Sequence, residues 1–159
     1  HYSLRLAVAA WYPENDDEPR GEFVRVQVEL ARGVADRERR NHLEVRQRDL
    51  LLAHEAEWVE PLADVLGCRP GEWGRWVFRR GFVEYFRLKC GTLLAGGMRL
   101  AARTPLRELN LDDPLTDGIA EVFINCSYLA GLRWLYADMG SLSAPVRKRF
   151  HKKFARVLR

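Results

Sequence analysis

The sequence predicts an α/β protein, with a helical N-terminal cap over residues 1–72 followed by a short solenoid with a small parallel sheet over residues 73–159. Three observations predict this arrangement. The first region is highly charged and places apolar residues at helical spacing, the second is rich in aromatic and β-branched residues broken by glycines, and an apolar triplet recurs there three times. We expect the two regions to share one core, because 159 residues correspond to one domain of ordinary size.

Composition indicates a packed, soluble protein. Hydrophobic residues make up 47% of the chain and charged residues 30%. The sequence contains no apolar run of roughly 20 residues that could span a bilayer, and no signal-peptide pattern at its start. We therefore expect a cytoplasmic protein that does not bind membranes.

Two helices are predicted at the start of the chain. Apolar residues at positions 4, 6, 8 and 11 indicate a first helix that Pro13 ends or bends. Pro19 suits the first turn of a second helix, and Gly33 suits its end. The alternation of apolar and polar residues over 24–30 would by periodicity alone indicate a strand, but the Pro19 start favours a helix.

A long charged helix is predicted to follow. Asp36 suits its N-cap, and one apolar face comprises Leu43, Leu50, Leu51 and His54. We expect a break at Pro61 and an end at Gly67. His54 is expected to be a core histidine with a hydrogen-bond partner.

The acidic segment 14–18 lacks the alternating ligands and central Gly of a calcium loop and is interpreted as a solvated turn.

The repeat is the most specific signal in the chain. An apolar residue, two spacers, an apolar residue, one spacer and a third apolar residue recur at intervals of 23 and 26 residues, within the 20–29 range of leucine-rich repeats. Because alternate residues of a strand point to opposite faces, the triplet residues should face a shared core on neighbouring parallel strands. The triplets are Val83, Phe86 and Leu88; Leu106, Leu109 and Leu111; and Leu132, Leu135 and Ala137.

A helix is predicted after each triplet. Thr92, Thr116 and Ser143 are expected to be the N-caps. The apolar residues expected to follow them are Leu94 and Met98; Ile119, Val122 and Phe123; and Val146 and Phe150.

Several segments together resemble the bacterial repeat-companion domain family, which places a helical N-terminal unit directly before leucine-rich repeats. They are residues 5–11 (RLAVAAW), 19–27 (PRGEFVRVQ), 53–58 (AHEAEW) and 78–84 (FRRGFVE). Residues 115–119 (LTDGI) and 129–135 (LAGLRWL) resemble repeats of the ribonuclease-inhibitor type. The chain departs from the family at Val8, Ala10 and Tyr12-Pro13. The resemblance implies a scaffold or recognition role, as part of a larger bacterial protein or assembly, and implies no catalytic residues.

The repeat register predicts a partner-binding surface on the strands. If the triplets point inward, the intervening residues point outward and form one patch suited to a protein partner. These residues are Tyr85, Arg87, Lys89, Glu108, Asn110, Asp112, Trp134, Tyr136 and Asp138.

Nucleic-acid binding is the first alternative. Seven Lys or Arg residues and no acidic residue lie between Val146 and Arg159. A basic patch of Arg147, Lys148, Lys152, Lys153 and Arg156 could neutralise phosphates. The apolar residues within this segment lie at helical spacing, so an amphipathic terminal helix with a solvated face explains the same charges.

An enzyme is the second alternative. The four histidines are widely separated and form no recognised motif with a Ser, Cys or metal-ligating partner. Cys68, Cys90 and Cys126 fit no zinc or disulfide spacing and are expected to be reduced, mostly buried thiols. We therefore expect no catalytic residues, no metal site and no cofactor.

Overall fold

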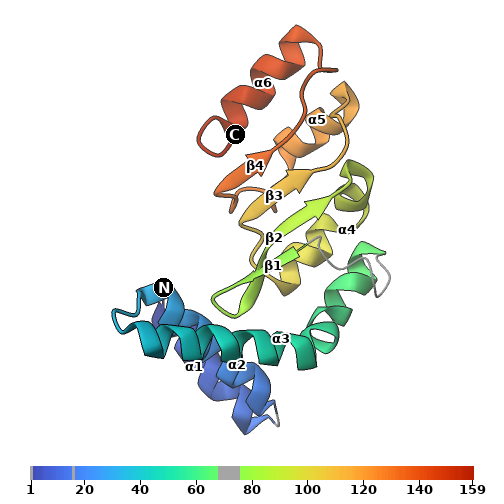
Figure 1. Cartoon of the computed structure of the whole chain (residues 1–159). Coiled ribbons are helices and arrows are strands. Elements are labelled where there is room, and N and C mark those ends of the chain that lie inside the picture. The colour runs from blue at the N-terminus through green and yellow to red at the C-terminus, as the bar shows by residue number, and fades with distance from the viewer. Residues whose placement is uncertain (1, 16, 68–75) are drawn as a thin grey trace. The chain divides into compact units, whose positions relative to one another are not determined.

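The computed structural model describes residues 2–15, 17–67 and 76–159, which form a mixed α/β fold. Six helices and one four-stranded mixed sheet are present among these residues (Figure 1). The chain divides into two compact units, one of His1–Pro61 with Phe78–Phe82 and the other of Leu62–Val77 with Val83–Arg159. The predicted boundary near residue 72 falls outside the described residues.

The first unit begins with two helices that pack together, α1 (Tyr2–Glu14) and α2 (Glu18–Arg32). Asp17 caps α2, since its side chain accepts a hydrogen bond from the Arg20 backbone N–H at 3.0 Å. The predicted start at Pro19 and end at Gly33 are confirmed, and Gly33 has a φ of 87° that favours glycine. Ala9, Val24 and Val28 form the buried cluster between the two helices.

The alternating segment 24–30 is helical, as predicted from the Pro19 start and from the resemblance to the repeat-companion family. Val24, Val26 and Val28 are buried, but Gln27 between them is buried as well. The helix is therefore covered on more than one face, which removes the helical periodicity that a half-exposed helix would display.

Helix α3 (Arg37–Leu66) also begins as predicted, because the Asp36 carboxylate accepts a hydrogen bond from the Glu38 N–H at 2.9 Å. The predicted break at Pro61 is wrong, since α3 is continuous through that residue. Burial of Leu62, Val65 and Leu66 directly after the proline stabilises the last turns and offsets the missing hydrogen bond. The helix ends before Gly67, which has a φ of 62°.

Strands β1 (Trp76–Arg79) and β2 (Phe82–Leu88) are joined by a two-residue turn. Arg80 and Gly81 both have positive φ, at 52° and 89°, as in the type I′ turns that connect antiparallel hairpins. The sheet has the order β1-β2-β3-β4, so β1 extends the predicted parallel sheet to a mixed one.

The repeat register is confirmed in the parallel strands β2, β3 (Glu108–Leu111) and β4 (Trp134–Tyr136). Phe86 pairs with Leu109, and Leu109 pairs with Leu135. All nine triplet residues are buried, with none more than 7% exposed.

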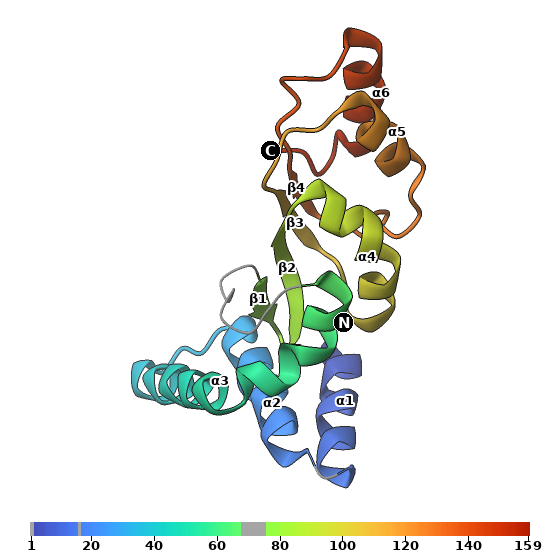
Figure 2. The ribbon, with the colours of Figure 1, turned by 90° about the vertical axis from the view of Figure 1, so that its right-hand side faces the viewer.

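A helix follows each of these strands: α4 (Cys90–Arg103), α5 (Asp117–Asn125) and α6 (Ala144–Phe154). Figure 2 shows the three helices on the same side of β2, β3 and β4. Thr116 is the N-cap of α5, as predicted, and Ser143 has the N-cap position of α6 without a side-chain cap.

The predicted N-cap of the first of these helices is wrong. Thr92 lies inside α4, whose N-cap is Lys89. Leu94 and Met98 are exposed. The buried face of α4 instead contains Leu93, Gly96, Gly97 and Leu100. The Gly96 Cα approaches the Val65 carbonyl so closely that a Cβ would lie 2.5 Å from that oxygen, which explains why a glycine occupies this inward position. Val122 of α5 is also exposed, whereas Phe123 is buried.

The end of the chain continues the strand register. Leu158 bridges Leu135 in parallel, the Leu135 N–H donates to the Val157 carbonyl at 2.7 Å, and the Arg159 N–H donates to the Leu135 carbonyl at 3.0 Å. Leu158 lies 23 residues after Leu135, the same interval that separates Phe86 from Leu109. Leu158 is therefore a fourth equivalent residue in the parallel pairing, which the pattern of three complete triplets does not include.

Candidate interaction surface

We term the nine outward residues of the predicted surface the strand face. Six of them lie in the parallel strands β2, β3 and β4, whereas Lys89, Asp112 and Asp138 lie beyond the ends of these strands. The register places Tyr85, Glu108 and Trp134 in one row and Arg87, Asn110 and Tyr136 in the next. None of the nine residues is buried; Tyr85, Glu108, Asn110 and Trp134 are half-buried and the others are exposed.

Three aromatic rings lie close together on the strand face. The centroids of Tyr85 and Trp134 are 6.2 Å apart with planes inclined at 42°, although β2 and β4 are separated by β3. Strands two positions apart in a sheet are about 9.6 Å apart, so these two rings lean toward one another across β3. Trp134 and Tyr136 are 6.5 Å apart with planes inclined at only 22°.

Charges of both signs flank the rings. The Arg87 guanidinium forms an ion pair with Asp112 across neighbouring strands, and this hydrogen bond raises the pKa of Arg87 above its usual value. The Asp138 side chain is exposed and accepts a hydrogen bond from the Gly140 N–H at 2.8 Å. Asp112 therefore balances the charge of Arg87 on the strand face.

The five residues of the predicted basic patch are all exposed on or just after α6. Arg147 donates to the carbonyls of Gly140 and Leu142 at 3.1 and 3.0 Å, so it holds the turn before α6. Arg149, which was not part of the predicted patch, forms an ion pair with Glu121 of α5.

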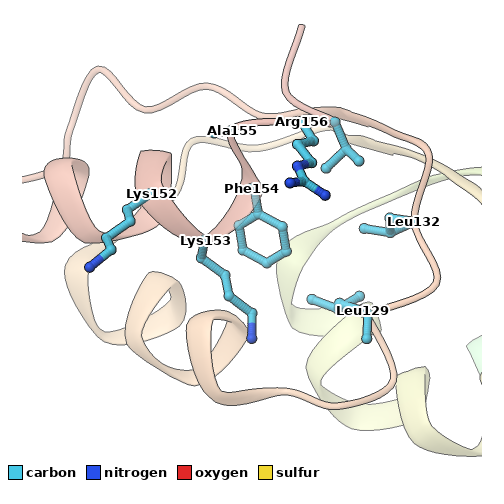
Figure 3. A pocket seen from close by; sticks show the side chains of 9 residues that line it. Leu129, Leu132, Lys152, Lys153, Phe154, Ala155 and Arg156 are labelled. Carbon is cyan, nitrogen blue, oxygen red and sulfur yellow. The ribbon is translucent and has the colours of Figure 1, made fainter.

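A pocket of about 410 Å³ lies beside three of the patch residues, Lys152, Lys153 and Arg156. Figure 3 shows the Phe154 ring and the side chains of Leu129 and Leu132 at its apolar surface, with Lys153 and Arg156 on either side of the ring. Sequence reasoning missed this pocket because its walls come from two segments, 129–132 and 152–157, that no motif connects.

The cysteines and histidines were considered for catalysis or metal binding. Within the described ranges, no three His, Cys, Asp or Glu side chains are grouped to hold a metal ion. Cys90 is buried and donates to the Asp113 carbonyl; burial, with Asp113 as a second cause, raises the pKa of this thiol to about 12. Cys126 is a half-buried free thiol, and Cys68 lies outside the described residues.

His54 is not the buried core residue that was predicted. Its side chain is 31% exposed, stacks on Trp58 at 5.4 Å and contacts the Glu57 carboxylate at 3.5 Å. Its position on the less covered part of α3 accounts for the difference, since Glu57 and the neighbouring Ala53 are exposed.

A second cluster, in the first unit, involves the motif residues at 20–27 and 78–82. The Arg20 guanidinium lies 4.6 Å from the ring centroid of Trp58 and 5.1 Å from that of Phe78, and burial lowers its pKa. The buried Gln27 amide donates to the Phe78 carbonyl at 3.4 Å and accepts from the Gly81 N–H at 2.6 Å. These contacts join α2 to the β1–β2 turn, so both motifs have a structural role.

Comparisons with protein-family models, curated protein sequences and solved structures gave no match to this chain. Among the described helices, none has an apolar stretch of the length and composition needed to cross a membrane.

Proposed function

We propose that this chain is a non-enzymatic protein-interaction module in which a helical region resembling the repeat-companion family precedes leucine-rich repeats. The observation that carries the proposal is the strand face itself. Tyr85, Trp134 and Tyr136 lie close together on the parallel strands β2 and β4, and tyrosine and tryptophan are among the residues that contribute most often to binding energy at protein interfaces.

The register of the strands supports the repeat interpretation. Equivalent residues of three strand–helix segments pair in order and bury their apolar side chains together, as stacked repeats must because one repeat cannot bury its own face. Leu158 adds a fourth equivalent residue. A cytoplasmic scaffold within a larger bacterial protein or assembly would use such a surface.

Photo-crosslinking tests the proposal. A photoreactive amino acid replaces Asn110 at the centre of the strand face, and cells of the native host are irradiated. We expect a discrete crosslinked protein that is lost when Trp134 and Tyr136 are both changed to Ala. The matched control is Val122→Ala on α5, because Val122 is as exposed as Tyr136, at 48% each, and lies off the strand face. A crosslinked product that survives the double change, or none at all, contradicts the proposal.

Nucleic-acid binding through α6 is a second candidate, because Lys152, Lys153 and Arg156 gather around one pocket. No ion pair involves any of the three within the described part of the chain. Phosphate contacts would give an affinity for random single- or double-stranded nucleic acid that falls steeply with salt. Binding that is absent at low salt, or unchanged when all three are replaced by Gln, contradicts this candidate.

A further inference from the structure

The pocket beside Phe154 has an apolar floor, formed by Leu129, Leu132 and Phe154. These side chains are only 3%, 7% and 4% exposed, so packing within their unit holds them in place. The pocket volume of about 410 Å³ lies within the range of sites that bind small molecules. The floor is therefore preformed, and it offers apolar surface to part of a ligand.

The rim of the same pocket is positively charged. Lys152, Lys153 and Arg156 line it, all three are exposed, and within the described residues none of them forms an ion pair. The sequence from 122 to 159 contains one acidic residue, Asp138, and it does not line the pocket. The charges around the floor therefore favour an anion.

The C-terminal end of α6 accounts for only part of this charge. Basic residues are favourable in the last turn of a helix, because the helix dipole places roughly half a negative charge there. The last turn of α6 contains Lys152 and Lys153, and Arg156 follows it. Half a negative charge does not balance three cations, so the rim keeps a net charge of about +2.5.

We propose that this pocket binds a small phosphate monoester that carries an apolar group. A monoester has a charge of about −1.5 to −2 near neutral pH, which complements the rim better than the single charge of a carboxylate. The planar guanidinium of Arg156 can donate two hydrogen bonds to a phosphate, and Lys153 on the other side of the Phe154 ring supplies a flexible donor (Figure 3). The apolar group lies against the floor. None of these residues belongs to the strand face, so this site does not depend on the interaction role proposed above.

Four small compounds test the two parts of the site separately. The probe is naphthyl phosphate. Methyl phosphate keeps the charge without the ring, naphthoate keeps the ring with a single charge, and naphthol keeps the ring without a charge. Titrations followed by amide NMR measure both the affinity and the position of binding. We expect naphthyl phosphate to shift the amide resonances of both walls, 129–132 and 152–157.

Naphthyl phosphate should bind at least about tenfold more tightly than each of the other three compounds, a difference of about 1.4 kcal/mol. Relative to methyl phosphate, burial of about 60 Å² of apolar surface is enough for this gain. Lys153→Gln and Arg156→Gln should each weaken binding of naphthyl phosphate several-fold. Lys148→Gln is the matched control, because it removes the same charge from an exposed residue of α6 that does not line the pocket. Because all three substituted residues are exposed, the melting temperatures should stay close to that of the parent.

Equal affinity for methyl phosphate and naphthyl phosphate would show that the cations attract phosphate without the floor, as they would attract a nucleic-acid backbone, and overturns the proposal. Equal affinity for naphthoate rejects selection of a phosphate. Resonance shifts confined to one wall, an equal loss of affinity in Lys148→Gln, or no binding of naphthyl phosphate also overturn it. Changing Trp134 and Tyr136 together to Ala should leave this binding unchanged, so failure of the strand-face experiment and failure of this one are separate results.

Discussion

Leu109 and Leu135 lie opposite each other in the parallel pairing of β3 and β4, and their side chains are 0% and 1% exposed. Each also holds the middle position of its triplet. Changing either residue to Ala removes buried methyl groups and leaves a cavity, so we expect each variant to lose about 2–5 kcal/mol of unfolding free energy. Urea denaturation measures this loss. Asn110→Ala, one residue along β3 and half-buried, is the control that should change stability little.

Gly81 combines a backbone φ of 89° with close contact to α2. A Cβ at this position would lie 2.4 Å from the Cγ2 atom of Val24. We expect Gly81→Ala to cost about 2–3 kcal/mol of unfolding free energy through backbone strain and displacement of α2. In Gly91→Ala, the added Cβ meets no atom within 4 Å, so that variant should be neutral or slightly more stable. Similar melting temperatures for the two variants would contradict the close approach.

The strands were predictable because the spacing of the apolar triplets follows from a single requirement, the burial of these residues. Each of the nine triplet residues must be buried, so the spacing in the sequence directly reflects the burial in the structure. The strand face follows from the same register by alternation. The pairing of Arg87 with Asp112 and the leaning of Tyr85 toward Trp134 depend on side-chain rotamers, which the alternation does not specify.

Other features were missed because tertiary packing outweighs a local preference. Pro61 indicates a helix break by its missing N–H, yet the buried residues after it keep α3 continuous. Leu94 and Met98 are apolar, but Gly96 and Gly97 turn the opposite face of α4 inward because their Cα atoms approach Val65 and Tyr128 closely. The pocket beside Phe154 is lined by segments 129–132 and 152–157, which are distant in the sequence and lie together only in the folded chain.

The buried thiol of Cys90 should make the unfolding free energy of the protein depend on pH in the alkaline range. Its pKa in the native state is about 12, whereas an unfolded thiol has a pKa of about 8.5. Because the native pKa is the higher one, the neutral thiol's contribution is fully present below pH 8.5 and is lost as pH rises toward 12. Above about pH 9, the parent should lose roughly 1 kcal/mol per pH unit relative to Cys90→Ala. Urea denaturation of both proteins between pH 8 and 10.5 measures this difference, and parallel curves would show that Cys90 ionises as freely as an unfolded thiol.

Trp134 and Tyr136 should affect binding without affecting folding. Tyr136 is 48% exposed, and Trp134 is half-buried beside Tyr85 and Tyr136 rather than among the triplet residues. Replacing both with Ala therefore removes little buried area, and we expect the melting temperature to stay close to that of the parent. The same change should weaken binding of the crosslinked partner by about 2 kcal/mol or more, because truncated aromatic residues at interfaces commonly cost this much. Scanning calorimetry measures the melting temperature, and a titration with that partner measures the change in binding free energy. A large loss of stability would show that the rings belong to the core, and the strand face would then have no aromatic binding centre.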